Sequence, residues 1–140
     1  LYNAPGVNAV GIAANQVAQL YRIFVIDCHY SKDQKQTYRP IIMINPEIIK
    51  TSEEPSTIME GCLSIPQQFA EVERPKSVRV QYLDIDGKIQ EYEAQDLESH
   101  VIQHELDHLN GVLFIDHLSR LKRSMILRKL DKLRRESSIL

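Results

Sequence analysis

Apolar residues in this chain form short runs before residue 95 and helical patterns after it. Ile23–Cys28 and Ile41–Ile44 are short runs rich in β-branched residues, which are typical of buried strands. Residues 78–83 alternate in polarity, and Asp86–Gly87 predicts a tight turn into another strand over residues 89–92. The middle of the chain is therefore expected to be antiparallel β-structure.

Polar and turn-forming residues separate the expected strands. Residues 31–37 are polar and charged, and they predict a loop. Asn45–Pro46 predicts the end of the second strand, with Ile48–Ile49 rejoining the sheet after this turn. Residues 52–56 predict another polar loop, and residues 59–66 predict an irregular segment bounded by glycine and proline.

Two helices are expected in the last part of the chain. The first begins near Asp96, a suitable N-cap, and stops at Asn110–Gly111, whereas the second covers residues 118–135. Their apolar positions recur at helical spacing: Leu97, Val101, Ile102 and Leu106, and then Leu118, Leu121, Met125, Ile126, Leu130 and Leu133. Strands followed by helices predict an α+β fold, with antiparallel or mixed sheets around a central helix and a C-terminal helix.

The first expected helix carries a metal-binding pattern, His104-Glu105-Leu106-Asp107-His108, which reads H-E-x-x-H. Residues four apart lie on one helical face, about 6 Å apart along the axis, so both imidazoles can reach one ion. Such an ion lowers the pKa of a bound water, and Glu105 is placed to take its proton. Because two histidines also occur on helices by chance, this interpretation needs a third ligand elsewhere.

The two cysteines are too few for a disulfide framework, which favours a reduced, cytosolic setting. Cys28 lies inside an expected strand and is interpreted as a small buried residue. Cys62 lies beside Gly61 on the irregular segment and is our candidate for the third ligand. A thiolate and two imidazoles leave one coordination position open, as in catalytic rather than structural sites.

Small residues precede Gln16 near the start of the chain. Gly11, Ala13 and Ala14 indicate close approach of the backbone to a neighbouring strand or a ligand. The Gln16 amide can donate to a substrate oxygen, although taken alone this position fits an ordinary surface glutamine better.

The length of 140 residues suits one domain, residues 1–140. No apolar run is long enough to span a membrane, and Leu1–Gly6 lacks the features of a signal peptide. Because the first residue is not methionine, we expect the chain to begin inside a longer protein.

Charge is unevenly distributed around a net value of −2. Residues 118–135 contain eight basic residues against Asp131, a net +7, which leaves −9 on the rest of the chain. A cationic segment on an acidic body suggests an anionic partner such as nucleic acid, and a solvated helix face is the simpler alternative.

Three segments together are far more specific than any one of them: Ala9–Gln16 (A-V-G-I-A-A-N-Q), Glu60–Ser64 (E-G-C-L-S) and Gln103–His108 (Q-H-E-L-D-H). In this order they resemble the signatures of peptide deformylases, which remove the formyl group from N-formylmethionine at the start of new bacterial or organellar proteins. The resemblance extends to the C-terminal helix of bacterial type 1 members. It implies one catalytic domain in the bacterial cytoplasm or a bacterial-type organelle.

The chain departs from the family pattern at three points. The family's N-terminal strand and most of its first helix have no counterpart, and Leu1–Asn3 resembles the end of that helix. Ala9 replaces the usual first glycine, which costs about 1 kcal/mol if that backbone is left-handed. His100 replaces an apolar pocket residue. Because His100 and His108 are about 12 Å apart along the helix axis, they cannot share one ion.

The resemblance also implies a set of site residues. The metal ligands are Cys62, His104 and His108, with a water in the fourth position. Glu105 acts on that water, and the Gln16 amide with the Leu63 backbone N–H stabilises the oxyanion. The expected ion in cells is Fe²⁺, with Ni²⁺, Co²⁺ or Zn²⁺ as substitutes.

The implied substrate is an extended formylmethionyl peptide that bonds to the backbone near Val10–Gly11. Its methionine side chain is expected in a pocket formed by Ile58, Leu97, His100 and Val101. Glu60 is expected to pair with Arg74, and His29 and His117 to be surface residues. The C-terminal helix is expected to dock on the ribosome near the peptide exit, with steep salt dependence, and neither a membrane nor DNA is an expected partner.

Two other functions stay open on the sequence. A zinc endopeptidase of the H-E-x-x-H type usually takes a downstream third ligand, but His117 lies beyond the Gly111 break and E-G-C-L-S would have no role. An inactive, metal-stabilised module that binds RNA or the ribosome is compatible with Ala9 and the absent N-terminal elements.

Overall fold

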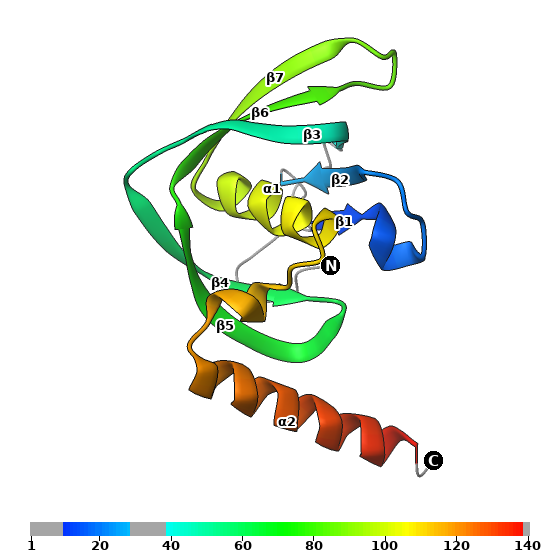
Figure 1. Ribbon diagram of the computed structural model, residues 1–140, viewed down its shortest axis with the longest axis vertical. Helices are drawn as coiled ribbons and strands as arrows, with labels where there is room; N and C mark the ends of the chain where they lie inside the picture. The colour runs from blue at the N-terminus through cyan, green and yellow to red at the C-terminus, as the bar shows by residue number, and fades with distance from the viewer. Residues whose placement is uncertain (1–9, 29–38, 139–140) are drawn as a thin grey trace.

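The computed structural model describes residues 10–28 and 39–138. In this part of the chain, two antiparallel sheets lie on either side of a central helix (Figure 1). One sheet has five strands in the order β1-β2-β3-β6-β7, namely β1 (Val10–Ala13), β2 (Ile23–Asp27), β3 (Ile41–Thr51), β6 (Ser77–Leu83) and β7 (Ile89–Gln95). The other pairs β4 (Pro55–Cys62) with β5 (Ile65–Pro75).

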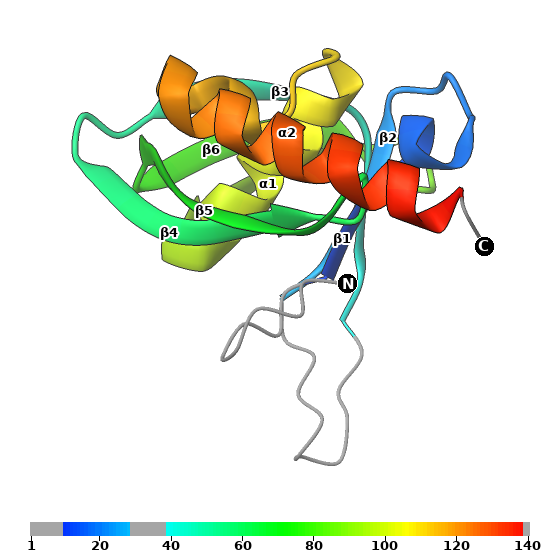
Figure 2. The same ribbon diagram turned by 90° about the horizontal axis from the view of Figure 1, so that it is seen from below.

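The central helix is α1 (Asp96–Leu109), and it contacts strands of both sheets. The short 3-10 turns η1 (Ala14–Val17) and η2 (Phe114–His117) come after β1 and α1. The last helix, α2 (Arg120–Ser137), packs against β5 and η2. It lies on the far side of β4 and β5 from α1, as Figures 1 and 2 show.

Two apolar clusters hold these layers together. The larger lies between the five-stranded sheet and α1, where alternate strand residues such as Phe24 and Ile26 meet Ile102. The smaller joins β5, η2 and α2, and it contains Ile65, Val72, Phe114, Ile115 and Ile126. Because α1 is packed between the sheets, its polar side chains are held in fixed positions toward β4 and β1.

The predicted α+β class and the antiparallel centre of the chain are confirmed. β6 and β7 pair through the predicted turn, in which Gly87 has a φ of +76°. β3 is longer than predicted, because Asn45–Pro46 does not end it. The strand passes this point through a register shift between Ile44 and Glu47, where Asn45 takes a left-handed φ of +49°.

The two-stranded sheet was not predicted. Residues 52–56, expected as a loop, include the first residues of β4, and residues 59–66, expected to be irregular, lie mostly in β4 and β5. A register shift between Gly61 and Cys62 is the irregular feature of this segment. Neither strand alternates cleanly between apolar and polar residues in its sequence, because each strand contacts several different elements.

The ends of α1 are set by backbone geometry more than by side-chain caps. Gln95 rather than Asp96 is the N-cap, and its side chain makes no cap hydrogen bond, so the predicted cap is wrong by one residue. The predicted stop is confirmed, because the Asn110 N–H bonds to the last turn and Gly111 has a left-handed φ of +75°.

α2 begins two residues later than predicted, because the Ser119 hydroxyl caps it by accepting from the Lys122 N–H. Of its expected apolar stripe only Ile126 is buried, and Leu121 is 72% exposed. Most of this helix therefore faces away from the rest of the described residues. Within those residues, no helix has the length and apolar character needed to cross a membrane.

Candidate metal centre

Three candidate ligand atoms come together where the last turns of α1 meet the end of β4. His104 and His108 lie one helical turn apart, with their Nε2 atoms 3.2 Å from each other. Cys62 ends β4 and places its Sγ 3.2 Å from His108 Nε2. One ligand atom from each of the three residues lies within 4.8 Å of the other two.

These separations suit a single tetrahedral ion. With metal–nitrogen distances of about 2.1 Å and metal–sulfur distances of about 2.3 Å, neighbouring ligand atoms lie roughly 3.4 to 3.6 Å apart. The Cys62–His108 and His104–His108 separations of 3.2 Å are slightly shorter than this range, and all three atoms lie within 4.8 Å of one another. A thiolate with two imidazoles accepts several divalent ions, so these donors fit a metal without selecting one.

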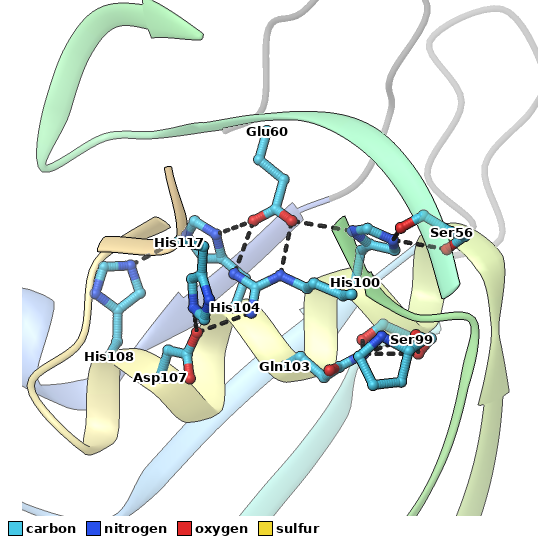
Figure 3. A network of polar contacts seen from close by, with 11 residues as sticks. Ser56, Glu60, Ser99, His100, Gln103, His104, Asp107, His108 and His117 are labelled. Atoms are coloured by element: carbon cyan, nitrogen blue, oxygen red, sulfur yellow. Dashed lines mark hydrogen bonds and ion pairs between the residues drawn. The ribbon is translucent and has the colours of Figure 1, made fainter. Parts of the chain in front are cut away.

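Glu60 holds the far nitrogen of His104 (Figure 3). Its Oε1 lies 2.9 Å from His104 Nδ1, and Arg74 bonds to both carboxylate oxygens, at 2.7 and 3.0 Å. The expected pairing of Glu60 with Arg74 is confirmed. Burial alone would raise the pKa of Glu60, but hydrogen bonds from His100, His104 and Arg74 hold it well below its usual range. The group is therefore a carboxylate that only accepts hydrogen bonds.

The same network reaches the surface through Asp107. Arg74 donates to Asp107 Oδ2 at 2.8 Å, and His117 Nε2 lies 2.7 Å from the same oxygen. His117 is exposed, as expected for a surface residue, but it has a specific partner in Asp107. His29 lies outside the described residues, as does Ala9.

The local electrostatics favour an ionised thiol. Burial alone would raise the pKa of the Cys62 thiol, but hydrogen bonds from His104 and His108 lower it to about 5. Burial alone would lower the pKa of His104, but hydrogen bonds to Cys62 and Glu60 raise it to about 9. Because the thiolate is the form that binds metals, Cys62 is in its ligating form at neutral pH.

Glu105 is buried beside these candidate ligands and packs against Gly11 of β1. It is 1% exposed, and its Oε2 has no hydrogen-bond partner in the described part of the chain. Burial raises the pKa of this carboxyl to about 7. A Cβ at Gly11 would lie 2.7 Å from Glu105 Oε1, so the predicted close approach at Gly11 is confirmed. Its partner is the Glu105 side chain, rather than a strand or a ligand.

Gln16 and Leu63 border Cys62. Gln16 Oε1 accepts from the Ala13 N–H at 2.9 Å, which fixes the amide plane. Its Nε2 then lies 3.4 Å from Ser64 Oγ and 3.6 Å from Cys62 Sγ. Leu63 directly follows Cys62 in the turn between β4 and β5, with its side chain 55% exposed.

The residues expected to line a methionine pocket come from β4 and α1. Val101 is buried in the larger apolar cluster, and Leu97 packs against that cluster. Ile58 is half-buried on β4. His100 is 1% exposed, and its ring nitrogens face Glu60 and Ser56. These positions do not test the pocket, which stays a prediction.

Sequence reasoning missed three polar residues of the site, Asn15, Ser56 and Asp107. Asn15 Nδ2 donates to the His108 carbonyl and so ties η1 to α1. Each of these residues adjoins a predicted site residue in the chain or lies on the same strand as one. For Asn15 and Asp107, a polar residue next to a predicted site residue is the signal that could have found them, whereas Ser56 has no such local signal.

An α+β domain that joins H-E-x-x-H on its central helix to a cysteine from a neighbouring strand has the arrangement of a metal-dependent hydrolase. The sequence pattern of the family described as polypeptide deformylase matches residues 2–124. The peptide deformylase of Mesorhizobium japonicum is 51% identical over 138 residues, which are 99% of this chain and 75% of that protein.

Solved structures agree with this match. The peptide deformylase from Ehrlichia chaffeensis has a TM-score of 0.81 and 36% identity, over 91% of this chain and 74% of that one. A class I type b peptide deformylase from Acinetobacter baumannii, solved with Met-ala-ser bound, has a TM-score of 0.71 and 37% identity, over 78% of this chain and 70% of that one.

The chain belongs to the polypeptide deformylase family. It is a hydrolase that removes the N-formyl group from newly made polypeptides, and the family is one of metalloenzymes. The comparisons give no support to an endopeptidase or to an inactive RNA-binding module.

Proposed function

We propose that Cys62, His104 and His108 hold one divalent metal ion for deformylation by this chain. The supporting observation is that their ligand atoms converge within 4.8 Å beside the buried Glu105 carboxyl. The bound ion would supply Lewis-acid activation of the attacking water and of the formyl carbonyl. Fe²⁺ is the ion proposed for the cell, with Ni²⁺, Co²⁺ or Zn²⁺ as substitutes, because thiolate and imidazole ligands suit all of them.

Glu105 is the proposed proton carrier. It accepts a proton from the attacking water and returns it to the departing amine, while formate leaves. A carboxyl whose pKa is raised to about 7 by burial can both accept and release a proton near neutral pH. Its Oε2, which has no partner in the described residues, is available for this exchange.

Gln16 and Leu63 are proposed to stabilise the negative charge that develops on the formyl oxygen. The hydrogen bond from the Ala13 N–H to Gln16 Oε1 leaves Nε2 directed toward Cys62. The Leu63 backbone N–H directly follows the ligand in the chain. Donors fixed before the reaction begins stabilise a transition state without reorganisation.

The peptide is proposed to bind as an added strand beside Val10–Gly11. β1 is an edge strand of its sheet in the described structure, and edge strands can pair with an extended peptide. The methionine side chain would then enter the pocket near Ile58, Leu97, His100 and Val101. The Met-ala-ser in the Acinetobacter baumannii relative supports a peptide that begins with methionine.

Formate release tests this proposal. Protein loaded anaerobically with Fe²⁺ or with Zn²⁺ would be assayed on formyl-Met-Ala, and we expect formate from both, with faster release from the iron form. An unformylated protein should stay uncleaved. Absence of formate release by the loaded protein would contradict the proposal, and so would endoproteolysis.

The basic C-terminal segment is proposed to bind ribosomal RNA near the exit of new peptides. Residues 118–135 carry a net charge of +7, and exposed Arg128 and Lys129 form no ion pair in the described part of the chain. Free cationic side chains on an outward-facing helix are suited to phosphate contacts. This partner would place the enzyme in the bacterial cytoplasm or a bacterial-type organelle.

A further inference from the structure

His100 is a buried residue of α1 that lies one helical turn before the ligand His104. Its Nδ1 is 3.0 Å from Glu60 Oε2, while Glu60 Oε1 is 2.9 Å from His104 Nδ1. We propose that His100 is a positioning residue, which fixes the Glu60 carboxylate and through it the orientation and tautomer of His104. This inference rests on the metal site proposed above.

The Glu60 carboxylate receives four hydrogen bonds, two on each oxygen. Oε1 is bonded by His104 Nδ1 and Arg74 Nη2, and Oε2 by His100 Nδ1 and Arg74 Nε. A carboxylate offers about four lone-pair sites, so the group is fully satisfied. Arg74 binds both oxygens from β5, and His104 and His100 each bind one oxygen from α1, so His100 supplies the second contact with that helix.

The hydrogen bonds also define which nitrogen of each ring carries a proton. Glu60 only accepts, so both His100 Nδ1 and His104 Nδ1 must donate to it. In a neutral His104 ring with its proton on Nδ1, the lone pair is on Nε2, which faces Cys62 and His108. A carboxylate behind a metal-binding histidine therefore fixes the tautomer that can bind a metal.

Ser56 holds the other side of the His100 ring. His100 Nε2 lies 2.8 Å from Ser56 Oγ and 3.1 Å from the Ser56 backbone oxygen. The Ser56 backbone oxygen only accepts, so that contact is a hydrogen bond only when Nε2 carries a proton, whereas an unprotonated Nε2 accepts from the Ser56 hydroxyl. In either form Nδ1 donates to Glu60. Ser56 and Glu60 are both on β4, so His100 and His104 form two successive links between α1 and β4 (Figure 3).

The burial of His100 indicates that its ring nitrogens have a role beyond lining the pocket proposed above. The residue is 1% exposed and both ring nitrogens have partners, so its polar atoms are not directed at a ligand. Burying an imidazole costs more free energy than burying the apolar side chain expected at this position, unless hydrogen bonds to the ring offset that cost. The geometry assigns this role to the contact with Glu60, which accepts hydrogen bonds from both His100 and His104.

The test compares His100→Leu with His100→Asn. Leucine fills similar space without a donor, whereas the asparagine amide nitrogen can take the place of Nδ1 and bond to Glu60. Zn²⁺ affinity would be measured by competition with a chromophoric chelator, and kcat and KM on formyl-Met-Ala. We expect His100→Leu to bind Zn²⁺ about 10-fold to 100-fold more weakly, with a lower kcat and little change in KM. His100→Asn should recover most of both losses.

Two further variants make the result decisive. Ser99→Ala, on the same helix, removes the bond from Ser99 Oγ to the Pro75 carbonyl and the bond that this oxygen accepts from Gln103 Nε2, without touching Glu60. Gln103 Nε2 keeps its bonds to the Pro75 and Ser99 carbonyls, so Zn²⁺ affinity should not change. Cys62→Ser should lower Zn²⁺ affinity whether or not His100 matters. If Cys62→Ser and the wild type bind Zn²⁺ alike, the metal site itself is wrong and this inference fails with it.

Other outcomes would overturn the inference while leaving the metal site intact. They are wild-type Zn²⁺ affinity in His100→Leu, equal losses in the leucine and asparagine variants, and an equal loss in Ser99→Ala. A rise in KM with kcat and Zn²⁺ affinity unchanged would instead place His100 in the substrate pocket. Thermal unfolding of each metal-free variant would show whether the fold is kept, and Ser56→Ala offers a milder change in the same chain of bonds.

Discussion

Gly11 of β1 lies directly against the side chain of Glu105 on α1. A Cβ at position 11 would come within 2.7 Å of Glu105 Oε1 and 3.0 Å of both Cγ and Cδ. Cβ atoms essentially never come so close to another atom, so any side chain at position 11 would force the Glu105 side chain to shift. The position of Glu105, the proposed proton carrier, thus depends on the absence of a side chain at Gly11, which is far from it in the sequence.

Substitution Gly11→Ala should therefore impair the reaction without removing the metal. The methyl group would displace the Glu105 carboxylate, and a displacement of about 1 Å in a reacting group can cost on the order of 100-fold in rate. Zn²⁺ content should stay at the wild-type level, because the three atoms nearest to that Cβ all belong to Glu105 and not to a proposed ligand. We would measure kcat on formyl-Met-Ala together with metal content.

Gly87→Ala is the matched control for this substitution. No atom lies within 4 Å of a Cβ at Gly87, but its φ of +76° is left-handed. Alanine there should cost about 1 kcal/mol of stability and leave kcat unchanged. Wild-type activity in Gly11→Ala, or the same loss of activity in Gly87→Ala, would show that Gly11 does not position Glu105 for the reaction.

Glu105→Gln should separate proton transfer from metal binding. The amide keeps the size of the side chain but cannot take a proton from water, and general acid–base groups contribute about 10²-fold to 10⁴-fold in rate. We expect kcat to fall by this factor while the Zn²⁺ content after gel filtration stays near one per chain. An active Glu105→Gln enzyme would disprove the proposed role of Glu105.

The sequence predicted the elements whose signals are local. The β6–β7 hairpin follows from alternation and one turn glycine, and α1 follows from helical spacing and a clear stop. β5 has no comparable pattern, because its residues are buried by contacts with α1, α2 and η2 in turn. Long-range packing therefore determines which residues of β5 are buried, and no short stretch of the sequence predicts this.

The same distinction applies to the site. The spacing of His104 and His108 fixes their shared face, whereas the contact of His104 with Glu60 joins residues 44 positions apart. For His100, its position in the chain suggested an apolar pocket. The direction of its ring, however, is set by Glu60 and Ser56, which come from β4. A local pattern can thus nominate candidate ligands on one helical face, but it does not contain the long-range hydrogen bonds that orient them.

Cys62→Ser should weaken metal binding far more than it weakens the fold. A serine hydroxyl stays protonated at neutral pH. Burial alone would raise the pKa of the Cys62 thiol, but hydrogen bonds from His104 and His108 outweigh burial and lower it to about 5. We expect most Zn²⁺ to be lost during gel filtration. Cys28→Ser is the control, because burial raises the pKa of that thiol to about 12 and it lies outside the ligand cluster. Equal metal contents in the two variants would contradict the ligand assignment.

Metal binding should release a proton at neutral pH. Without metal, His104 has its pKa raised to about 9, so at pH 7 its ring is protonated while Cys62 is already a thiolate. A metal requires a neutral ring with a free lone pair on Nε2, so binding should release about one proton per chain. The apparent Zn²⁺ affinity should then fall as the pH is lowered from 9 toward 5.

Calorimetry in buffers of different ionisation enthalpy would measure this release directly. At pH 7 the apparent binding enthalpy should change with the buffer, with a slope of about one proton. The sign is fixed by the raised pKa of His104, since a folded-state pKa below 7 would leave no proton to release from this ring. A slope near zero at pH 7 would show that His104 is already neutral in the metal-free protein.

Binding to ribosomes through α2 should depend steeply on salt. Each phosphate contact made by a lysine or arginine adds roughly 0.7 to 0.9 to the slope of log K against log salt. Arg128→Gln with Lys129→Gln should therefore lower that slope by about 1.5 and weaken binding at low salt. Both side chains are exposed on α2, beyond β4 and β5 from the metal centre, so turnover of formyl-Met-Ala should not change.

Lys50→Gln is the control, because Lys50 is exposed on β3, in the other sheet. It also removes one positive charge, but from a surface that would not face the RNA, and its slope should match that of the wild type. A salt-independent association, or equal slopes for the control and the α2 variant, would mean that α2 does not contact phosphate.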